Sequence, residues 1–406
     1  MIQMAVLGFG TVGSGVVELV DRNQDVIKKT VPEGIHVKYI LDLREFPDSP
    51  YQDRVTHDFQ DILDDGDISV ICETMGGKKP AYEFTKAALE KGISVCTSNK
   101  ELVAAHGPEL LKIAADHQCS YLFEASVGGG IPLIRPINES LTQENITAIS
   151  GILNGTTNYI ITRMEKAGLS FQDALREAQE KGYAERNPEA DVEGHDACRK
   201  IAILSSIICG KTVRYEDIPC EGISRITTTD FAYARAMNMA IKLLGISRRY
   251  QDGSMSVRTA PFLVRADHPL HSVQDVFNGV FIHGNMVDDI MFYGRGAGKF
   301  PTASAVVSDV IECARNIGRT VRFRWDDEVM TLSAPDSESY RYFIRIDAGE
   351  AEKAAGLFGQ QPPVRHEGAP EGEFAFVTPR MTEKEFRTKE SALHSVKQCI
   401  RLLEDQ

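Results

Sequence analysis

The sequence predicts an α/β protein with a doubly wound parallel sheet, a following α+β region and a smaller C-terminal unit. Three observations support this fold class. An apolar strand at residues 4–7 runs directly into a glycine-rich turn and a helical pattern. Short apolar strands then alternate with helices as far as residue 123, which is the βαβ rhythm of a parallel sheet. After Pro132 this rhythm stops, and from residue 339 a β-α-β-β-α-β pattern begins.

The first turn has the spacing G-x-G-x-x-G between the opening strand and a helical pattern at residues 15–20. Glycines there permit a tight turn and let the backbone approach a pyrophosphate, which the N–H groups of the helix N-terminus can bind. We therefore predict a Rossmann dinucleotide-binding domain over residues 1–131, completed by a return helix at about 302–330. The alternative is a glycine-rich turn without a ligand. The fingerprint residues are Gly8, Gly10, Thr11, Val12 and Gly13.

The second strand, residues 37–41, ends at Asp42. An acidic residue in this place accepts hydrogen bonds from the ribose hydroxyls of NAD and repels the 2′-phosphate of NADP. Arg44, two residues later, would soften that repulsion. The pattern favours NAD and leaves NADP open.

Polar residues follow the next strands, at 69–72, 94–97 and 121–123, which alternate with helical patterns at 82–91 and 109–117. Ligands of doubly wound sheets bind beyond the carboxyl ends of the strands. We therefore expect Thr74, Ser98 and Lys100 to lie near the reactive end of the cofactor. An ordinary exposed lysine is the alternative for Lys100.

A middle domain is predicted over residues 132–301, with a helix at 134–141 and a strand at 146–153. Asn154, Gly155 and Thr156 then form a strand-to-helix turn. N–H groups and threonine hydroxyls at such a turn suit a carboxylate. Plain N-capping by Asn154 or Thr156 explains the same residues equally well.

The most chemically suggestive stretch contains Glu185, Asp191, Asp196 and Lys200 within sixteen residues. Asp196 and Lys200 are four apart and share one helix face, whereas Glu185 and Asp191 lie in a loop interrupted by Pro188. Such a loop and helix could hold an ammonium group and move a proton. The alternative is an exposed loop beside a surface ion pair of a few tenths of a kcal/mol, on the order of what such pairs contribute.

Composition limits the partners and the compartment. The chain has 406 residues, 42% hydrophobic and 25% charged, as in a globular protein. A net charge of −13 argues against nucleic acid, no apolar run is long enough for a membrane span, and the first residues do not resemble a secretory signal. The eight scattered cysteines form no C-x-x-C pair, which favours reduced thiols in a cytoplasmic protein over disulfides or zinc.

Six segments together resemble the homoserine dehydrogenase family, in order and spacing, over residues 1 to about 320. The resemblance implies reversible interconversion of L-homoserine and L-aspartate 4-semialdehyde with NAD(P)H, in the biosynthesis of threonine, methionine and isoleucine. The segments are VLGFGTVGSGV, SNKELVAAHG, FEASVGGGIP, GILNGTTNYI, GYAERNPEADVEGHDACRKIAIL and FYGRGAGKFPTASAVVSDV.

The resemblance also implies roles for individual residues. Lys200 falls on the family's proton-transferring lysine, Asp196 on its partner, and Lys100 on the lysine near nicotinamide and substrate. The substrate-binding positions fall on Glu185, Tyr183, Asp191, Gly155 and Thr156.

Further positions concern the cofactor and a cation. Gly298 falls on a cofactor contact of the glycine-rich return segment. Many family members carry an arginine where this chain has Leu41, which again favours NAD. A monovalent cation, Na⁺ or K⁺, is implied at the backbone carbonyls of Glu124, Val127, Gly129 and Ile131.

The tail, residues 339–406, has strand patterns at 340–346, 364–366, 374–378 and 396–402 and helical patterns at 351–358 and 382–393. This ferredoxin-like order resembles an ACT domain, which implies an amino-acid effector such as threonine. The alternative is a tail that serves only oligomerisation, and we expect a homodimer or a higher homo-oligomer.

Two other functions remain open from the sequence. One is another NAD(P)-dependent amino-acid dehydrogenase on the same cofactor domain. The other is a non-catalytic regulator that senses a nucleotide and an amino acid, against which the intact set of Glu185, Asp196 and Lys200 argues.

Overall fold

The computed structural model describes residues 1–404, which divide into two compact units. Unit 1 comprises residues 1–144, 202–215 and 294–330, and unit 2 comprises residues 145–201, 216–293 and 331–404. Among the described residues, no helix is both long and apolar enough to cross a membrane.

Unit 1 is built around a six-stranded parallel sheet with the order β3-β2-β1-β4-β5-β6. This is the doubly wound arrangement that the alternating pattern predicted, with β1 and β4 at its centre. The strands are β1 (Ile2–Leu7), β2 (Ile35–Leu41), β3 (Val55–Thr56), β4 (Ile68–Glu73), β5 (Ser94–Thr97) and β6 (Tyr121–Leu122).

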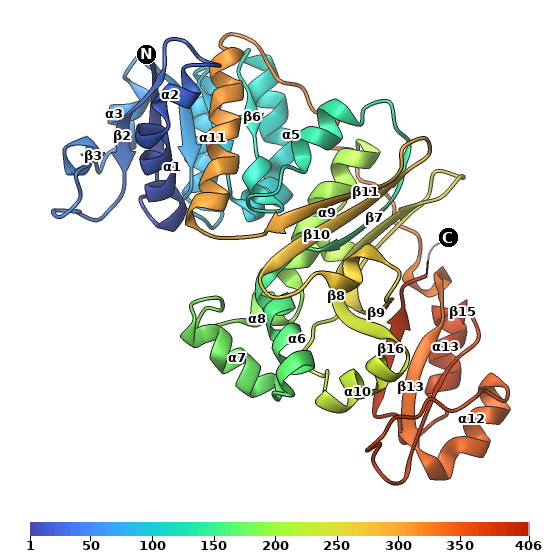
Figure 1. The fold of residues 1–406 in the computed structure, drawn as a ribbon. Helices are drawn as coiled ribbons and strands as arrows, with labels where there is room; N and C mark the ends of the chain where they lie inside the picture. The colour runs from blue at the N-terminus through green and yellow to red at the C-terminus, as the bar shows by residue number, and fades with distance from the viewer. Residues whose placement is uncertain (405–406) are drawn as a thin grey trace. The chain divides into compact units, whose positions relative to one another are not determined.

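Helices from both ends of unit 1 cover this sheet. In Figure 1, α11 (Lys299–Arg315, orange) lies beside α1 (Thr11–Arg22, dark blue). The two helices approach closely at Gly15, where an added Cβ would come within 2.9 Å of the Lys299 carbonyl oxygen. The return helix therefore belongs to the same compact unit as the parallel sheet. The other helices of this unit are α2 (Gln24–Ile27), α3 (Phe59–Leu63), α4 (Ala81–Glu90) and α5 (Lys100–Asp116).

Two predicted helices of unit 1 have different bounds in the structure. α5 starts at Lys100 rather than at residue 109, because the Asn99 side chain caps it by accepting from Leu102 N–H and the helix continues through Pro108. The Trp325 ring packs on neighbouring Gly107, where an added Cβ would lie 2.8 Å from it. The helix predicted at 134–141 is present at residues 134–140, and its last five residues, Pro136–Ser140, are π-helical.

Unit 2 contains an eight-stranded mixed sheet with the order β11-β10-β7-β8-β9-β16-β13-β14. Its centre is the long antiparallel pair of β8 and β9, which the sequence analysis did not predict. The strands from the middle of the chain are β7 (Ile146–Ile152), β8 (Met239–Arg249), β9 (Met255–Arg265), β10 (Phe277–Gly284) and β11 (Asp288–Arg295). The helices are α6 (Gly155–Ala167), α7 (Phe171–Glu180), α8 (Glu189–Val192), α9 (His195–Cys209) and α10 (Thr228–Ala236).

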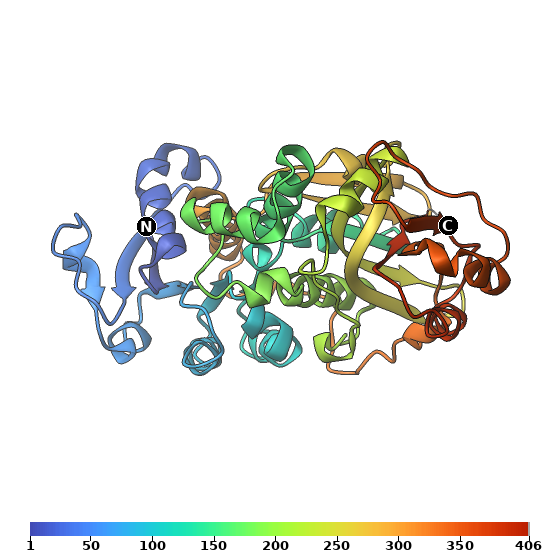
Figure 2. The same cartoon turned by 90° about the horizontal axis from the view of Figure 1, so that it is seen from below.

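The tail adds three strands to this same sheet. β16 pairs in parallel with β9, and β13 pairs antiparallel with both β16 and β14; Figure 2 shows the red tail strands next to the yellow strands. The tail elements are β12 (Ser339–Tyr340), β13 (Tyr342–Asp347), α12 (Ala351–Phe358), β14 (Glu373–Val377), β15 (Met381–Thr382), α13 (Glu383–Glu390) and β16 (Gln398–Leu402).

One predicted tail strand is absent from the described residues. Residues 364–366 form no strand, although Val364 N–H donates to the Ala375 carbonyl at 2.8 Å, at the side of β14 where a ferredoxin-like fold has its fourth strand. The proline pair at 362–363 removes the N–H donors that a longer ladder would need. A single apolar core joins the middle strands and the tail, with Phe262, Tyr342 and Phe386 fully buried.

Candidate active site

The glycine-rich turn after β1 has the geometry of a dinucleotide site. Gly8 has φ +92°, a conformation that side chains rarely adopt. A Cβ on Gly13 would lie 1.9 Å from the Gly8 carbonyl oxygen and 2.8 Å from Thr74 Oγ1. Thr74 Oγ1 donates to the carbonyl oxygens of Leu7 and Gly8, at 3.0 and 2.9 Å. Thr74 therefore ties the end of β4 to the turn.

The N-terminus of α1 is open to an anion. Gly10 is its N-cap and provides no side-chain cap, and the first turn, which starts with Thr11 and Val12, carries no acidic residue. A Cβ on Gly10 would meet nothing within 4 Å. Uncapped N–H groups and the positive end of the helix dipole suit a pyrophosphate. These residues therefore fit a dinucleotide.

Asp42 lies directly after β2 and faces this turn. Its carboxylate accepts from Phe9 N–H at 2.8 Å and from the Arg44 guanidinium at 2.9 and 3.0 Å. The hydrogen bonds from Arg44, together with that from Phe9, lower the pKa of Asp42 to about 2. The carboxylate is therefore ionised throughout the neutral pH range.

A buried carboxylate that was not among the predicted site residues organises the ends of β4 and β5. Glu73 accepts from Thr97 Oγ1 at 2.6 Å and from Met75 N–H at 2.8 Å. Burial raises the pKa of Glu73, and this effect outweighs the hydrogen bonds, which lower it. Ser98 N–H approaches the Glu73 carbonyl at 3.4 Å, and Lys100 is the first residue of α5. The strand-end position of Glu73, just before Thr74, was the available signal.

The loop after β6 carries the four backbone carbonyls at which the family resemblance implies a monovalent cation. The Glu124 carboxylate is turned inward, where it accepts from the N–H groups of residues 133, 134 and 135 at 2.5–2.8 Å. Ile131 N–H donates to the Gly128 carbonyl, and Ser126 to that of Phe123. The hydrogen bonds that close this turn are therefore accepted by other carbonyls, and not by those of Glu124, Val127, Gly129 and Ile131.

The return segment packs against that loop within unit 1. A Cβ on Gly129 would lie 2.2 Å from the Gly296 carbonyl oxygen, and Gly130 N–H donates to the Arg295 carbonyl at 3.1 Å. Gly298, with φ +123°, is the N-cap of α11. Two glycine-rich segments far apart in the sequence thus lie side by side.

In unit 2, α9 presents the lysine and the aspartate that the sequence singled out. Lys200 Nζ donates to Asp196 Oδ2 at 2.7 Å and to the Leu153 carbonyl at 2.8 Å. Their side chains are 11% and 3% exposed, so this is not a surface ion pair. A buried pair of this kind is held in one geometry by its surroundings and depends on both partners.

Asn154 joins this pair to the acidic loop. Its Nδ2 donates to Asp191 Oδ1 at 2.7 Å and to Asp196 Oδ2 at 2.8 Å, while its Oδ1 caps α6 by accepting from Thr157 N–H. Sequence reasoning gave Asn154 only the capping role. One side chain therefore caps α6 and aligns two carboxylates 37 and 42 residues away.

The other predicted substrate residues lie around this network to different degrees. Thr156 Oγ1 donates to the Tyr183 carbonyl at 2.6 Å, which fixes the loop against the start of α6. Gly155 lies so close to the Val276 carbonyl that a Cβ would be 2.9 Å from it. The Glu185 side chain is exposed. The backbone carbonyl of this residue accepts a hydrogen bond from Gln179 Nε2. The structure groups Asp191, Asp196 and Lys200 but leaves Glu185 outside the hydrogen-bonded cluster.

The arrangement suits alcohol–carbonyl redox chemistry. A lysine ammonium bound to a carboxylate can give or take the proton of a substrate oxygen. The nearby Asp191 carboxylate can bind a positively charged substrate group.

Known sequences and structures match this chain along most of its length. A family model described as "Homoserine dehydrogenase, NAD binding domain" matches residues 8–124, and one described as "Homoserine dehydrogenase" matches residues 132–311. The homoserine dehydrogenase of Bacillus subtilis (strain 168) is 37% identical over 372 residues, which cover 89% of this chain and 85% of the relative.

Solved structures agree with these matches. The homoserine dehydrogenase of Thiobacillus denitrificans superposes with a TM-score of 0.90 at 31% identity, covering 99% of this chain and 98% of that one. A hyperthermophilic archaeal homoserine dehydrogenase mutant, in complex with NADPH, has a TM-score of 0.65 at 26% identity and covers 77% and 98%. The chain therefore belongs to the homoserine dehydrogenase family, whose members are NAD(P)-dependent oxidoreductases.

Proposed function

We propose that this enzyme interconverts L-homoserine and L-aspartate 4-semialdehyde, with Lys200 as the group that moves the hydroxyl proton. The observation that carries the proposal is the buried chain of hydrogen bonds from Lys200 through Asp196 and Asn154 to Asp191. When bound, the nicotinamide supplies the hydride acceptor or donor. Lys200 gives a proton to the developing alkoxide when the aldehyde is reduced, and takes it back when the alcohol is oxidised.

Substrate recognition follows from the charges around this chain. Asp191 and Glu185 bind the substrate ammonium, each charge-assisted contact contributing roughly 1.5–3 kcal/mol. Tyr183 lies beside Glu185, and Gly155 and Thr156 offer the substrate carboxylate the start of α6. Lys100 assists at the nicotinamide end, where it begins α5.

A homoserine-dependent assay tests the reaction. We expect reduced nicotinamide to accumulate, measured by its ultraviolet absorbance, when L-homoserine and NAD are added, and not with L-serine, which is one methylene shorter. Oxidation of another amino alcohol in preference to homoserine would point to a different amino-acid dehydrogenase. Failure of any substrate to support turnover, with cofactor still bound, would point to a non-catalytic sensor.

For the cofactor we propose NAD in preference to NADP. The ionised Asp42 carboxylate accepts from the ribose hydroxyls and repels a 2′-phosphate, although its partner Arg44 offsets part of that repulsion. Gly8, Gly10, Gly13, Ser98 and Gly298 line the rest of the cofactor path in this proposal.

Asp42→Asn tests this preference. We expect the ratio of kcat/KM for NAD to that for NADP to exceed one in the wild type and to fall at least tenfold in the variant, because the repelling charge is gone. Asp48→Asn, on the same loop and exposed, is the matched control and should keep the wild-type ratio. A wild-type enzyme that strongly prefers NADP would contradict the proposal.

We further propose a monovalent cation, Na⁺ or K⁺, at the loop after β6. The carbonyls of Glu124, Val127, Gly129 and Ile131 are hard oxygen ligands on a tight turn, and the turn's own hydrogen bonds use other carbonyls. Such an ion would hold the loop and the return segment at Gly129 and Gly298 in place.

The tail is proposed to be an ACT-like regulatory part that binds an amino acid such as threonine. The support is its strand order, with β13 between β16 and β14 and two helices in the connections. We also propose that the enzyme works as a homodimer or a higher homo-oligomer in the biosynthesis of threonine and methionine. None of the eight cysteines forms a disulfide within residues 1–404, which favours a cytoplasmic location.

A further inference from the structure

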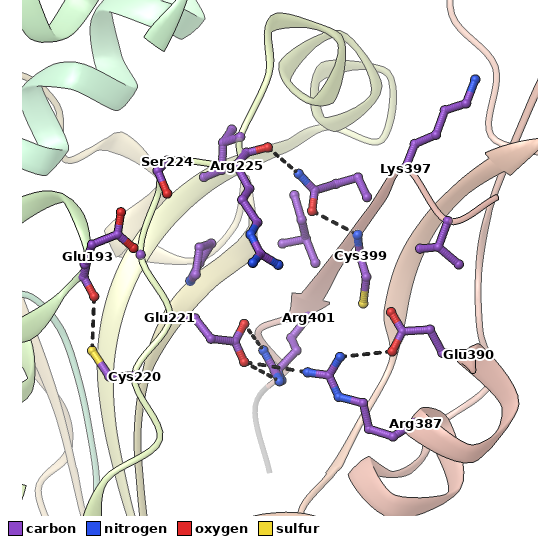
Figure 3. Close-up of a pocket in the computed structure, with 16 residues that line it drawn as sticks. Glu193, Cys220, Glu221, Ser224, Arg225, Arg387, Glu390, Lys397, Cys399 and Arg401 are labelled. Carbon is purple, nitrogen blue, oxygen red and sulfur yellow. Dashed lines mark hydrogen bonds and ion pairs between the residues drawn. The ribbon is translucent and has the colours of Figure 1, made fainter. Parts of the chain in front are cut away.

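One buried side chain of unit 2, that of Asn278 on β10, differs from its polar neighbours in having no partner. Charged groups elsewhere in the unit are paired: beside the tail, Arg401 Nη2 lies 2.8 Å from Glu221 and Arg387 Nη1 lies 2.9 Å from Glu390 (Figure 3). Asn278 is fully buried, and within residues 1–404 neither its Nδ2 nor its Oδ1 has a hydrogen-bond partner. Because an unpaired buried amide is costly, a ligand can supply what the protein does not.

Asn278 points away from the apolar core of unit 2. An added Cβ on Gly279, the next residue, would meet Leu270 of that core, and side chains alternate along a strand. Asn278 therefore lies on the opposite face of the sheet. Gly279 pairs with Ile152 of β7, which places Asn278 beside Leu153.

This opposite face is the one that α9 covers. An added Cβ on Gly245 of β8 would lie 3.0 Å from side-chain atoms of both Leu153 and Ile201. Ile201 follows Lys200 on α9, and Lys200 Nζ donates to the Leu153 carbonyl at 2.8 Å. The residue beside Asn278 is thus the one whose carbonyl accepts from Lys200.

The Asn278 amide also lies against the start of α6. An added Cβ on Gly155, the first residue of that helix, would be 3.5 Å from Asn278 Oδ1. The loop before Asn278 is fixed to the same helix, because Asn158 Nδ2 donates to the carbonyls of Asp275 and Phe277 at 3.1 and 3.0 Å. The unpaired amide is therefore held beside a helix N-terminus, where an anion is favoured.

We propose that Asn278 is a further substrate-binding residue, whose amide turns past Gly155 when homoserine binds and donates through Nδ2 to the substrate carboxylate. Since no group among residues 1–404 holds the amide, it breaks no hydrogen bond when it turns. Asn154 already accepts from Thr157 N–H, whereas the N–H groups of Gly155 and Thr156 have no partner within the helix and suit the same carboxylate. The proposal rests on the homoserine reaction proposed above and adds a specificity-determining donor to that site.

Asn278→Leu tests this contact, because leucine has nearly the shape of asparagine without its polar atoms. We expect the KM for L-homoserine to rise roughly tenfold or more, the usual loss for a hydrogen bond to a charged group. The kcat and the KM for the cofactor should change little. The melting temperature of the free enzyme should stay the same or rise, since an unpaired buried amide is removed. Steady-state kinetics and thermal unfolding of the full-length enzyme measure these effects.

Two other asparagines provide matched controls. Asn158→Leu removes a side chain that donates to backbone carbonyls, so it should lower the melting temperature. Asn285→Leu, at an exposed position just after β10, should keep the wild-type KM. L-2-aminobutyrate is homoserine without its hydroxyl group. It should compete with homoserine in the wild type and bind Asn278→Leu roughly tenfold or more weakly, because its carboxylate makes the same contact.

The outcomes separate this contact from the reaction on which it rests. An Asn278→Leu enzyme with the wild-type KM overturns the contact and leaves the homoserine reaction standing. A melting temperature lowered as in Asn158→Leu also overturns it, because protein groups would then hold the amide. If homoserine binds more weakly but L-2-aminobutyrate does not, the amide contacts the reacting oxygen and the assignment to the carboxylate fails. A wild type that oxidises no homoserine overturns both the reaction and the contact.

Discussion

Replacing Lys200 with methionine is expected to lower kcat roughly 10²- to 10⁴-fold in both directions, the usual range for loss of a positioned acid–base group. Methionine keeps most of the side-chain volume but removes the proton that Nζ shares with Asp196 and the Leu153 carbonyl. The KM for the cofactor should change little, because Lys200 belongs to unit 2, whereas the glycine-rich turn belongs to unit 1. Steady-state kinetics in both directions, with cofactor binding followed by fluorescence, measure these effects.

The loss must be separated from unfolding, because Asp196 is then left as a buried carboxylate without its cation. Removing one partner of a buried pair costs about 3–5 kcal/mol. Combining Asp196→Asn with Lys200→Met removes that charge, so the urea midpoint should recover while kcat stays low. Lys242→Met is the matched control: this lysine is fully buried, burial lowers its pKa to about 8, and its Nζ donates to the Val273 carbonyl at 2.6 Å. Wild-type kcat in Lys200→Met, or its recovery in the double variant, would remove Lys200 from the reaction.

Gly10→Ala is expected to impair cofactor binding alone, whereas Gly13→Ala is expected to impair both stability and cofactor binding. A Cβ on Gly10 meets nothing within 4 Å of the protein, so folding should be unaffected and only the approach of a pyrophosphate is blocked. We expect the KM for the dinucleotide to rise at least tenfold with an unchanged melting temperature. A Cβ on Gly13 lies 1.9 Å from the Gly8 carbonyl oxygen, so that variant should lose both stability and cofactor binding.

Thermal unfolding with and without NAD measures the two effects together. The wild type should be stabilised by the cofactor, Gly10→Ala should show the wild-type melting temperature without that stabilisation, and Gly13→Ala should melt lower in both conditions. Gly66→Ala, a loop glycine that also has open space around it, is the matched control. A Gly10→Ala enzyme with normal cofactor affinity would contradict the dinucleotide site.

The fold of unit 1 could be predicted because its signals are local. A strand, three spaced glycines and a helix follow one another within the first 22 residues, and each later strand is a short apolar run. β8 and β9 could not be predicted in the same way. They are buried on both faces, so they lack the alternation of a half-exposed strand, and they contain charged residues such as Lys242 and Arg258. Arg258 approaches Glu338 and Glu383, whose positions depend on the tail.

The candidate site was predictable in its residue types but not in its connections. Spacing placed Asp196 and Lys200 on one helix face, and the structure shows the pair buried rather than exposed. Asn154 was missed because a local role, capping α6, already accounted for it. Its second role depends on residues 37 and 42 positions away, which only tertiary packing brings to it. The predicted helix at 109–117 covered only the second half of α5, which begins at Lys100 and continues through Pro108.

The parallel pairing of β16 with β9 has a consequence for any shortened form of this enzyme. The ladder runs through Phe262 and Leu263, whose partners on β16 are Arg401 and Leu402. Without the tail, β9 would become an exposed, hydrophobic edge strand with unpaired N–H and C=O groups. Such an edge is a template for the addition of a strand from another chain. Whatever it binds, the last stretch of the polypeptide also shields the catalytic half from aggregation.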